Sequence, residues 1–375
     1  MVVPNVGHEG LETEYKQIMS VYDEYNEIGR NNIKATSSDF INMVGEEGVK
    51  DIVKKVFLGD NVRDVTEFIT QRRLINSYSA MLELYLKTFN LHNDSIKEFI
   101  EFIAKDLQKT KGDAKLLDLW LLGLTKKGLD NIVRTEENIV DYQFSFESSV
   151  NDTVEDLKKS YGELSGTIEM NGSVINLNWN IMVLMFIAIG AQTLSIRGSA
   201  KSMNGKMFEK LVLGALLTVL GFTFLSGPPC KVDKTKRLFW LSNMDENERE
   251  TDATVIYNGK AISIDIGFIG KGNPEITLDK VTRFGAYKRI GGIPHDMATV
   301  IIVDTIGENS DLFKKAKRVN GYVLQMKNNN WTTEFAKTIC EIMDIEHELS
   351  NQRVEDLENY FDEKLKKIDM KLFMR

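Results

Sequence analysis

Two aspartates that flank a predicted β-hairpin are the residues of this sequence best suited to chemistry. Asn258-Gly259 lies between two β-rich runs, and this dipeptide is the strongest short-range signal for a two-residue type I′ turn. A turn at these positions continues the strand pairing until Asp252 faces Asp265. Directly opposed residues have Cβ atoms about 5 Å apart, so the two carboxylates repel each other unless a cation lies between them. The spacing therefore predicts a divalent-cation site.

The strand that carries Asp265 alternates between bulky and small residues. Isoleucines 262, 264 and 266 share one face, and the other face carries Ala261, Ser263, Asp265 and Gly267. Small neighbours leave room for a ligand beside Asp265. Mg²⁺ suits such a site because it binds a few carboxylate oxygens and retains several waters. The alternative is a bulged hairpin, or two aspartates that lie in solvent at the strand ends.

The elements that must position these aspartates form a β-rich region in the second half of the chain. Strands are predicted at residues 253–257, 261–269, 298–304 and 321–326. Residues 311–319 form a short helix-like link between the last two strands, as a strand-helix-strand crossover requires. The charged, periodic tail from residue 332 onward is predicted to be helical. The C-terminal half is therefore α/β or α+β.

The first half of the chain is predicted to be helical. No proline occurs between Pro4 and Pro228, which long uninterrupted helices permit and a turn-rich β domain rarely shows. Residues 64–90 and 95–107 place apolar side chains at helical spacing. No DNA-reading motif stands out before residue 166, so this half reads DNA, mediates dimerisation, or does both.

Two apolar stretches, residues 181–191 and 211–225, raise the question of a membrane. Each is shorter than the roughly 18–20 apolar residues needed to cross a bilayer. Basic residues lie between them, including Arg197 and Lys201. We interpret the stretches as buried core helices and expect no membrane. A membrane-associated protein is the competing interpretation, which partition into detergent would reveal.

The charge distribution and the cysteine content limit the possible functions and the cellular compartment further. The formal net charge is -8, yet residues 197–237 hold eight basic residues against two acidic ones, and residues 271–289 hold five against two. Such clusters are either solvated surface or contacts to nucleic acid. The two cysteines, Cys230 and Cys340, lack disulfide or zinc-site spacing. Without a signal-peptide pattern at the N-terminus, we expect a cytoplasmic protein.

The residues around the two aspartates resemble a known nuclease superfamily. Thr251-Asp252, twelve intervening positions and Asp265-Ile266-Gly267 are similar to the PD-(D/E)XK motif. In that superfamily an aspartate opening one strand and an acidic residue on the next bind the metal beside a lysine. The resemblance covers residues 195–330. Residues 265–284 also resemble type II restriction endonucleases of the CfrBI-like group.

The resemblance implies an α/β fold: a restriction-endonuclease-like central mixed sheet flanked by helices, with a large helical N-terminal region. We expect a helical domain at residues 1–165 for DNA recognition, dimerisation or both. A nuclease core at residues 166–330 and C-terminal helices at residues 331–375 complete the chain. The implied protein is a homodimeric type II restriction endonuclease that hydrolyses double-stranded DNA sequence-specifically with Mg²⁺.

The resemblance also assigns catalytic residues. Asp252 and Asp265 are metal ligands, and Glu209 fits the glutamate that a helix before the sheet often contributes in this superfamily. Glu209 is otherwise a first-turn residue that favours the helix dipole. The motif lysine is missing, because Gly267 stands in its place. We expect Lys280 or Glu275, just downstream of the strand, to replace it.

DNA contacts are expected on both sides of this site. Arg197, Ser199, Lys201 and Ser202 lie in a small, basic segment predicted to precede a helix, where side chains and backbone amides suit phosphate groups. Asn273 and Arg283 are candidates on the other side. Two rivals stay open: a nonspecific repair or defence nuclease, and a DNA-binding protein whose nuclease core has lost catalysis.

Overall fold

The computed structural model describes residues 20–34, 36–60, 62–89, 95–132, 135–170, 172–242, 251–267, 287–305 and 321–374. The chain divides into two compact units. Residues 1–35 and 68–201 form one unit, here called the helical unit. Residues 36–67 and 202–375 form the other, here called the sheet unit. The sheet unit therefore combines an early segment with the C-terminal half, whereas the sequence suggested divisions after residues 165 and 330.

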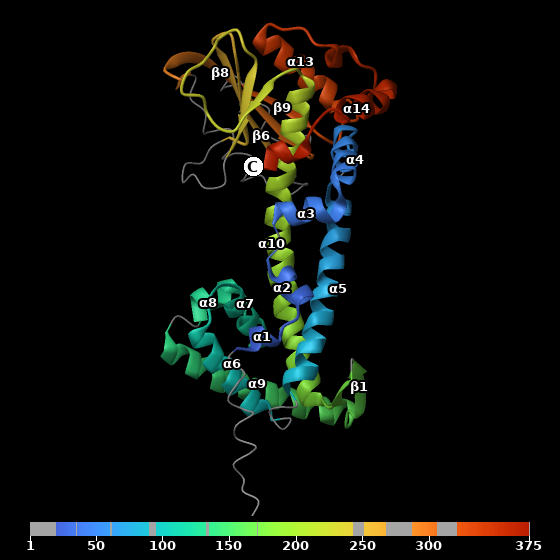
Figure 1. The fold of residues 1–375 in the computed structure, drawn as a ribbon, viewed down its shortest axis with the longest axis vertical. Coiled ribbons are helices and arrows are strands. Elements are labelled where there is room, and N and C mark those ends of the chain that lie inside the picture. Colours follow the sequence, from blue (N-terminus) through green and yellow to red (C-terminus); the bar gives the residue numbers. More distant parts are fainter. Residues whose placement is uncertain are drawn as a thin grey trace, which may run out of the picture. The chain divides into compact units, whose positions relative to one another are not determined.

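The helical unit consists mainly of helices (Figure 1), and their buried side chains form one apolar core. Its helices are α1 (Val21–Glu24), α2 (Glu27–Ile33), most of α5 (Val62–Thr88), α6 (Ile96–Lys109), α7 (Gly112–Leu121), α8 (Lys126–Ile132), α9 (Glu136–Tyr161) and the first part of α10 (Trp179–Val219). In α6, the apolar residues predicted at helical spacing are all buried. The Ser95 side chain caps this helix by accepting a hydrogen bond from the Glu98 N–H. The two helical segments predicted in this half are confirmed.

A small β-hairpin also belongs to the helical unit. Strands β1 (Gly166–Met170) and β2 (Ser173–Leu177) pair antiparallel. Ile175 is only 1% exposed and joins the core of this unit. The sequence had not indicated this hairpin, because its strands are short and half-exposed.

One long helix replaces the two separate core helices expected from the apolar stretches. α10 runs without interruption from Trp179 to Val219. Gly190, Gly198 and Gly205 are all inside it, and each is tolerated at a cost of about 1 kcal/mol relative to alanine. The segment from Ser195 to Ser202 is therefore mid-helix, contrary to the expectation that it precedes a helix. Glu209 is likewise far from the first turn.

The length and composition of α10 would allow it to cross a membrane, but this is weak evidence. Its most apolar 18-residue window has mean hydropathy 1.7, and 39% of that window is buried within the protein. Core helices of soluble proteins meet the same criterion. The early part of α10 packs into the core of the helical unit through residues such as Leu184 and Ile196. Leu211 and Leu216, in its later part, are fully buried as well.

The sheet unit contains a seven-stranded mixed sheet. Its strands are β3 (Thr223–Leu225), β4 (Leu238–Leu241), β5 (Ala253–Tyr257), β6 (Lys260–Gly267), β7 (Tyr287–Ile290), β8 (Ile293–Val303) and β9 (Gly321–Gln325). The order is β3-β4-β5-β6-β8-β7, and β9 also pairs with β8. β6, β8 and β9 are mutually parallel, whereas β4, β5 and β6 form an antiparallel run. The carboxyl ends of the three parallel strands therefore meet at one edge.

The four strands predicted from sequence are all present in this sheet. β5 has the predicted bounds, and β6, β8 and β9 overlap the other three runs. The parallel pairing of β8 with β9 agrees with the predicted crossover. The helix-like link at residues 311–319 lies outside the described residues.

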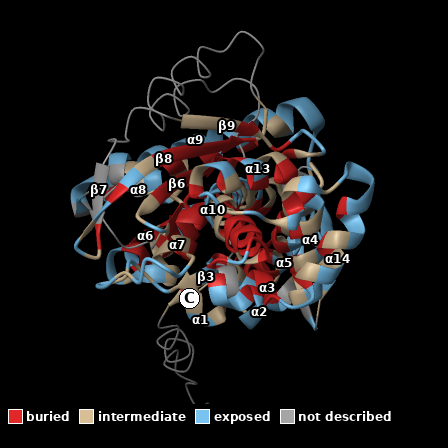
Figure 2. Cartoon of the chain, turned by 90° about the horizontal axis from the view of Figure 1, so that it is seen from above, coloured by how far each residue is buried: buried red, intermediate tan, exposed pale blue. Residues whose placement is uncertain are grey.

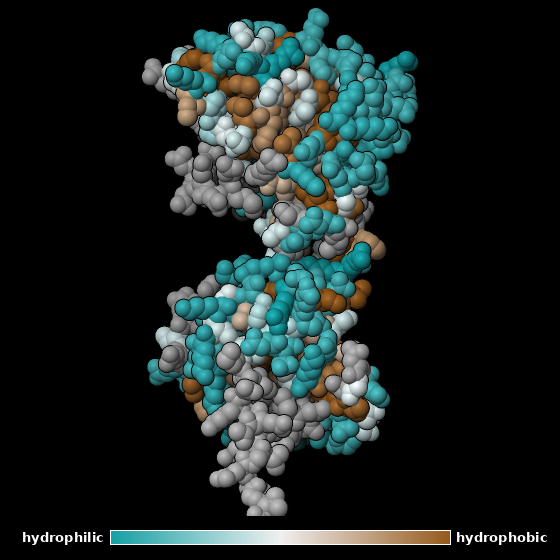
Figure 3. All heavy atoms as spheres, viewed as in Figure 1, coloured by the Kyte–Doolittle hydropathy of each residue, from teal (hydrophilic) through white to brown (hydrophobic). Residues whose placement is uncertain are grey.

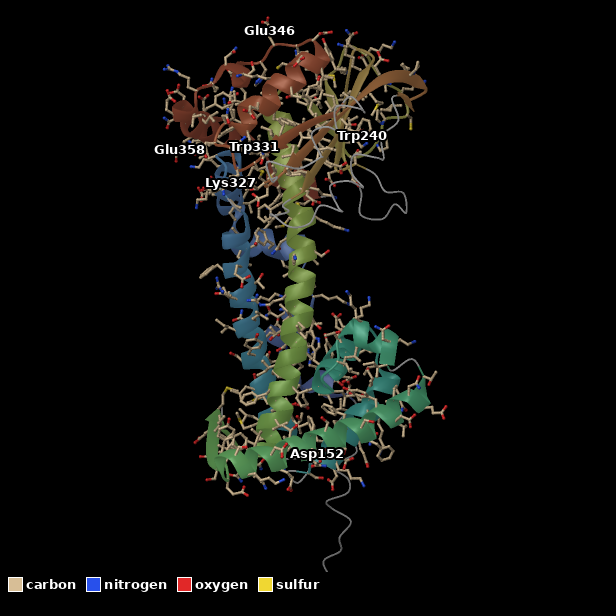
Figure 4. All side chains as sticks on the ribbon, turned by 180° about the vertical axis from the view of Figure 1, so that it is seen from behind. Asp152, Trp240, Lys327, Trp331, Glu346 and Glu358 are labelled. Atoms are coloured by element: carbon tan, nitrogen blue, oxygen red, sulfur yellow. The ribbon has the colours of Figure 1, made fainter. Side chains whose placement is uncertain are left out.

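Helices flank the sheet, as the fold class requires (Figure 2). They include α3 (Ser37–Val44), α4 (Glu46–Phe57), α13 (Trp331–Met343) and α14 (Leu357–Leu365), besides the later part of α10. The indole N–H of Trp331, labelled in Figure 4, donates a hydrogen bond of 2.8 Å to the Val56 carbonyl. This bond attaches the predicted helical tail to the early segment of the chain.

Candidate active site

The hairpin that organises the site has the predicted turn and register. Asn258 has φ 48° and Gly259 has φ 78°, so both central residues take the positive φ that a type I′ turn requires. β5 and β6 pair from Tyr257 opposite Lys260 through Ala253 opposite Ile264. In this register Asp252, which directly precedes β5, and Asp265, near the carboxyl end of β6, lie at the same edge of the sheet.

The regular pairing ends one step before the two aspartates. The Asp252 carbonyl accepts a hydrogen bond of 3.1 Å from Ser242, on the β4 side. Its carboxylate instead accepts the Ile266 N–H at 2.8 Å, on the β6 side. The Asp252 side chain thus reaches past Asp265 to the next backbone amide of β6. This contact holds the Asp252 carboxylate against β6.

Asp265 lies on the face of the sheet that the sequence predicted. We call this side of the sheet the Asp265 face; it comprises Ala261, Ser263, Asp265 and Gly267 of β6 with their register partners. The opposite face is apolar, and its residues Ile262, Ile264 and Ile266 are fully buried. Asp265 itself is 4% exposed. Burial of a charged carboxylate is costly unless the charge is balanced.

The Asp265 face changes from apolar to polar toward the carboxyl end of β6. Ala261 belongs to a small apolar cluster with Leu238, Trp240, Ile256 and Ile290; Trp240 is labelled in Figure 4. The next residues on this face, Thr254, Ser263 and Thr299, are register partners and buried. Asp265 follows them. The polar end of the face coincides with the edge where the parallel strands end.

A residue that the sequence-based interpretation missed lies at the same edge. Gly267, Val303 and Gln325 are register partners across β6, β8 and β9. Because paired residues of parallel strands point to the same side, Gln325 is on the Asp265 face. Only the parallel order of the three strands identifies it, since Gln325 is 60 residues from Asp265 in sequence.

The donor set suits magnesium better than a metal held entirely by protein. Among the described residues, no group of three or more histidine, cysteine, aspartate or glutamate side chains is placed to hold a metal ion. Mg²⁺ needs only one or two carboxylates, with waters and phosphate oxygens completing its coordination. The carboxylates of Asp252 and Asp265 would be sufficient protein ligands for such a site.

The other predicted site residues differ in burial and in whether the structure describes them. Arg197, Ser199, Lys201 and Ser202 are exposed on α10, where Arg197 and Lys201 are one turn apart on one face. The Ser199 hydroxyl donates a hydrogen bond to the Ile196 carbonyl at 3.0 Å. Backbone N–H groups in the middle of a helix already donate to carbonyls of the preceding turn, so the backbone amides of this segment do not suit phosphate binding. Glu209 is half-buried further along α10. Asn273, Glu275, Lys280 and Arg283 lie outside the described residues.

A mixed sheet flanked by helices, with paired aspartates at its carboxyl edge, defines the restriction-endonuclease-like class of nucleases. Residues 46–311 match the CfrBI restriction endonuclease family. Type II restriction enzyme CfrBI from Citrobacter freundii is 32% identical over 354 residues, which cover 91% of this chain and 95% of that protein. No solved structure matches the chain. The chain belongs to the CfrBI restriction endonuclease family and is an endodeoxyribonuclease.

Proposed function

We propose that this protein is a Mg²⁺-dependent enzyme that hydrolyses phosphodiester bonds of double-stranded DNA at a specific sequence. The observation that carries the proposal is the Asp252 carboxylate held on the Ile266 amide beside Asp265. Similarity to a type II restriction enzyme over 95% of that enzyme's length supports the same conclusion. Catalysis takes place at the carboxyl edge of β6 and, as for such enzymes generally, in the cytoplasm.

Magnesium bound there would neutralise phosphate charge and lower the pKa of a water molecule. Asp252 and Asp265 would hold the cation. Glu209 on α10 is proposed as a third ligand, which would have to move toward them, because the described residues do not place three such side chains together. The hydrogen bond from Ile266 orients Asp252, so its carboxylate does not need to reorganise when the cation and DNA bind. Lys280 or Glu275 takes the part of the lysine absent at Gly267.

DNA binding is assigned to basic and polar side chains. Arg197, Ser199, Lys201 and Ser202 are proposed to contact phosphates from the exposed face of α10, and Asn273 and Arg283 are further candidates for DNA contacts. Phosphate contacts supply affinity without base selection. The mostly hydrophilic surface visible in Figure 3 is compatible with a polar substrate. We further propose a homodimer, because a two-fold pair of active sites matches a palindromic sequence and cuts both strands.

The test is incubation of purified protein with long duplex DNA in Mg²⁺ or in EDTA. Wild type is expected to produce discrete fragments only with Mg²⁺. Asp265→Asn should abolish cleavage, whereas Asp296→Asn, an exposed aspartate on β8, should not. A smear without discrete fragments would indicate a nonspecific nuclease. Binding without cleavage across many sequences would contradict the proposal.

A further inference from the structure

One side of α10 within the helical unit exposes large apolar side chains. Phe186 is 56% exposed and Leu194 is 69% exposed. Gly190 and Gly198 are also exposed, and the four residues follow one another at intervals of four. Residues at this interval form a ridge along the surface of a helix. We call these four residues the α10 ridge.

Large and small residues alternate along the α10 ridge. A Cβ atom added to Gly190 or Gly198 would meet no heavy atom within 4 Å, so each glycine leaves an open notch beside a protruding side chain. A glycine in a helix interior costs about 1 kcal/mol relative to alanine, and it allows another backbone to approach closely. A helix that inserts its own large residues into the notches would fit this ridge.

The exposed apolar surface continues onto α5, which lies beside α10 in the helical unit (Figure 1). The hydroxyl groups of Tyr78 and Thr193 are 2.6 Å apart, so the two helices touch next to Leu194. Ile75, three residues before Tyr78 on α5, is 63% exposed. Within one copy of the chain, 39% of the most apolar 18-residue window of α10 is buried. Exposed apolar residues that gather in one place indicate an interaction surface.

A second copy of the chain supplies a surface that complements the α10 ridge. In an antiparallel helix pair with a two-fold axis between Gly190 and Leu194, each Leu194 lies opposite Gly190 of the partner subunit. Each Phe186 then lies opposite Gly198 of the partner subunit. Every large residue meets a notch, and both copies use the same surface, as a two-fold contact requires. An axis through Leu194 would instead bring the two Leu194 side chains together.

The centre of this contact is tighter than its margins. Packed helices cross at an angle, so the two copies of α10 are closest at Gly190 and Leu194 and diverge toward Phe186 and Gly198. A large phenylalanine side chain suits the wider margin, which also leaves room for a methyl group at Gly198. The fit therefore depends most on the pair at the centre.

The basic residues of α10 favour the antiparallel orientation. Arg197 and Lys201 are exposed on one face at the later end of the ridge. A parallel pair would bring the two Arg197 side chains together. In the antiparallel pair they are ten residues apart along the helix, about 15 Å at 1.5 Å per residue, which exceeds the Debye length of about 8 Å at physiological salt. Lys201 lies beyond the ridge, so the phosphate contact proposed for it is compatible with this dimer.

We propose that two copies of this chain dimerise by packing their α10 ridges antiparallel across a two-fold axis between Gly190 and Leu194. This inference rests on the homodimer of the proposed function and assigns its interface to the helical unit. The carboxylates of the candidate active site take no part in the contact.

The test is sedimentation velocity of the full-length protein, without DNA, over a range of protein concentrations. Wild type is expected to be a dimer. Leu194→Glu places a charge at the centre of the contact and should raise the dissociation constant of the dimer roughly 30-fold or more. Phe144→Glu, which changes an exposed apolar residue on α9 of the same unit, is the matched control and should leave the dimer unchanged.

The register is tested by exchanging the large and the small residue at the centre. Gly190→Leu opposes a leucine to Leu194 of the partner subunit and should weaken the dimer, although the new side chain has open space within one copy. Adding Leu194→Ala to Gly190→Leu should recover most of the lost affinity, because each large residue again faces a small one. Far-UV circular dichroism should show unchanged helix content in every variant.

Wild type that is monomeric at all concentrations would overturn the inference, as would a dimer that Leu194→Glu leaves intact. A double variant that dimerises no better than Gly190→Leu would also overturn it, and so would loss of the dimer only together with loss of helix content. Monomeric wild type that binds anionic phospholipid vesicles through Leu194 would assign this surface to a membrane instead. Wild type that fails to cut long duplex DNA in Mg²⁺ contradicts the nuclease function whether or not it dimerises, so the two failures are distinguishable.

Discussion

The Asp252 carboxylate accepts a hydrogen bond from the Ile266 backbone N–H at 2.8 Å, across the gap between β5 and β6. In a continued ladder that N–H would bond to a backbone carbonyl. Here the Asp252 side chain accepts that N–H, while the Asp252 carbonyl accepts the Ser242 N–H on the β4 side and continues the β4–β5 pairing. One residue thus serves both neighbouring strands, and its carboxylate lies beside Asp265.

This relationship predicts different results for two substitutions of Asp252. Asp252→Asn keeps an oxygen that accepts the Ile266 N–H but removes the charge, so cleavage should fall by at least about 10²-fold while unfolding is little changed. Asp252→Ala leaves the N–H without its partner and should also lower the free energy of unfolding by about 1–2 kcal/mol. Urea unfolding and a Mg²⁺ cleavage assay measure the two effects. Equal stability of the two variants would show that the hydrogen bond contributes nothing.

Phosphate contacts on α10 predict a salt-dependent effect at Lys201. If this exposed lysine neutralises one phosphate, Lys201→Ala should weaken binding in Ca²⁺ and reduce the slope of log K against log salt by about 0.9. Binding is measured by fluorescence anisotropy from low to moderate salt. Lys105→Ala, which removes an exposed lysine ion-paired with Glu101 on α6, is the control. An unchanged slope for Lys201→Ala would remove this residue from the DNA interface.

Two glycines predict stability changes of opposite sign. Gly259 has φ 78° in the hairpin turn, so Gly259→Ala should destabilise the protein by roughly 1–2 kcal/mol through backbone strain. Gly198 is in the interior of α10, where Gly198→Ala should stabilise by about 0.5–1 kcal/mol. An added Cβ meets no heavy atom within 4 Å at either site. Chemical denaturation that moves both variants in the same direction would contradict the assigned backbone conformations.

Asp118 in the helical unit predicts a pH dependence of stability. The pKa of Asp118 is raised to about 7, mainly because the carboxyl group is buried. The hydrogen bond from Thr110 lowers this pKa and the nearby Asp106 raises it, and both effects are smaller than that of burial. Between about pH 4 and pH 7 the folded state holds a proton that the unfolded state has lost. The contribution of Asp118 to the free energy of unfolding therefore falls as pH rises through this window, by up to about 1.4 kcal/mol per pH unit.

Asp118→Asn removes this pH-dependent contribution to the free energy of unfolding, because an amide does not titrate. The stability of the variant relative to wild type should rise between pH 4 and pH 7 and level off above. Urea unfolding at half-unit pH steps measures the difference. A difference that stays constant with pH would mean that Asp118 is already ionised at pH 4 in the folded protein.

Local patterns in the sequence were sufficient for the hairpin and its neighbouring strands. Asn258-Gly259 determines both the turn type and the pairing of β5 with β6, because a two-residue loop leaves one register. Alternation along β6 likewise placed Asp265 opposite the isoleucine face. These features depend on residues within about fifteen positions of one another, so no distant contact was needed to predict them.

Longer-range features were decided by tertiary structure. α10 is one helix because both ends pack into cores, and burial outweighs the glycine cost that suggested a break. Three strands, β3, β4 and β7, are only three or four residues long. We attribute their stability to pairing with neighbouring strands more than to the intrinsic β propensity of their residues. The edge shared by Asp265 and Gln325 exists only because β6, β8 and β9 are parallel and in register. The sequence by itself determined the acidic hairpin and the alternation of small and bulky residues around it. The residues that complete the site come from strands far apart in the chain, because pairing between such strands is selected by burial of the whole sheet.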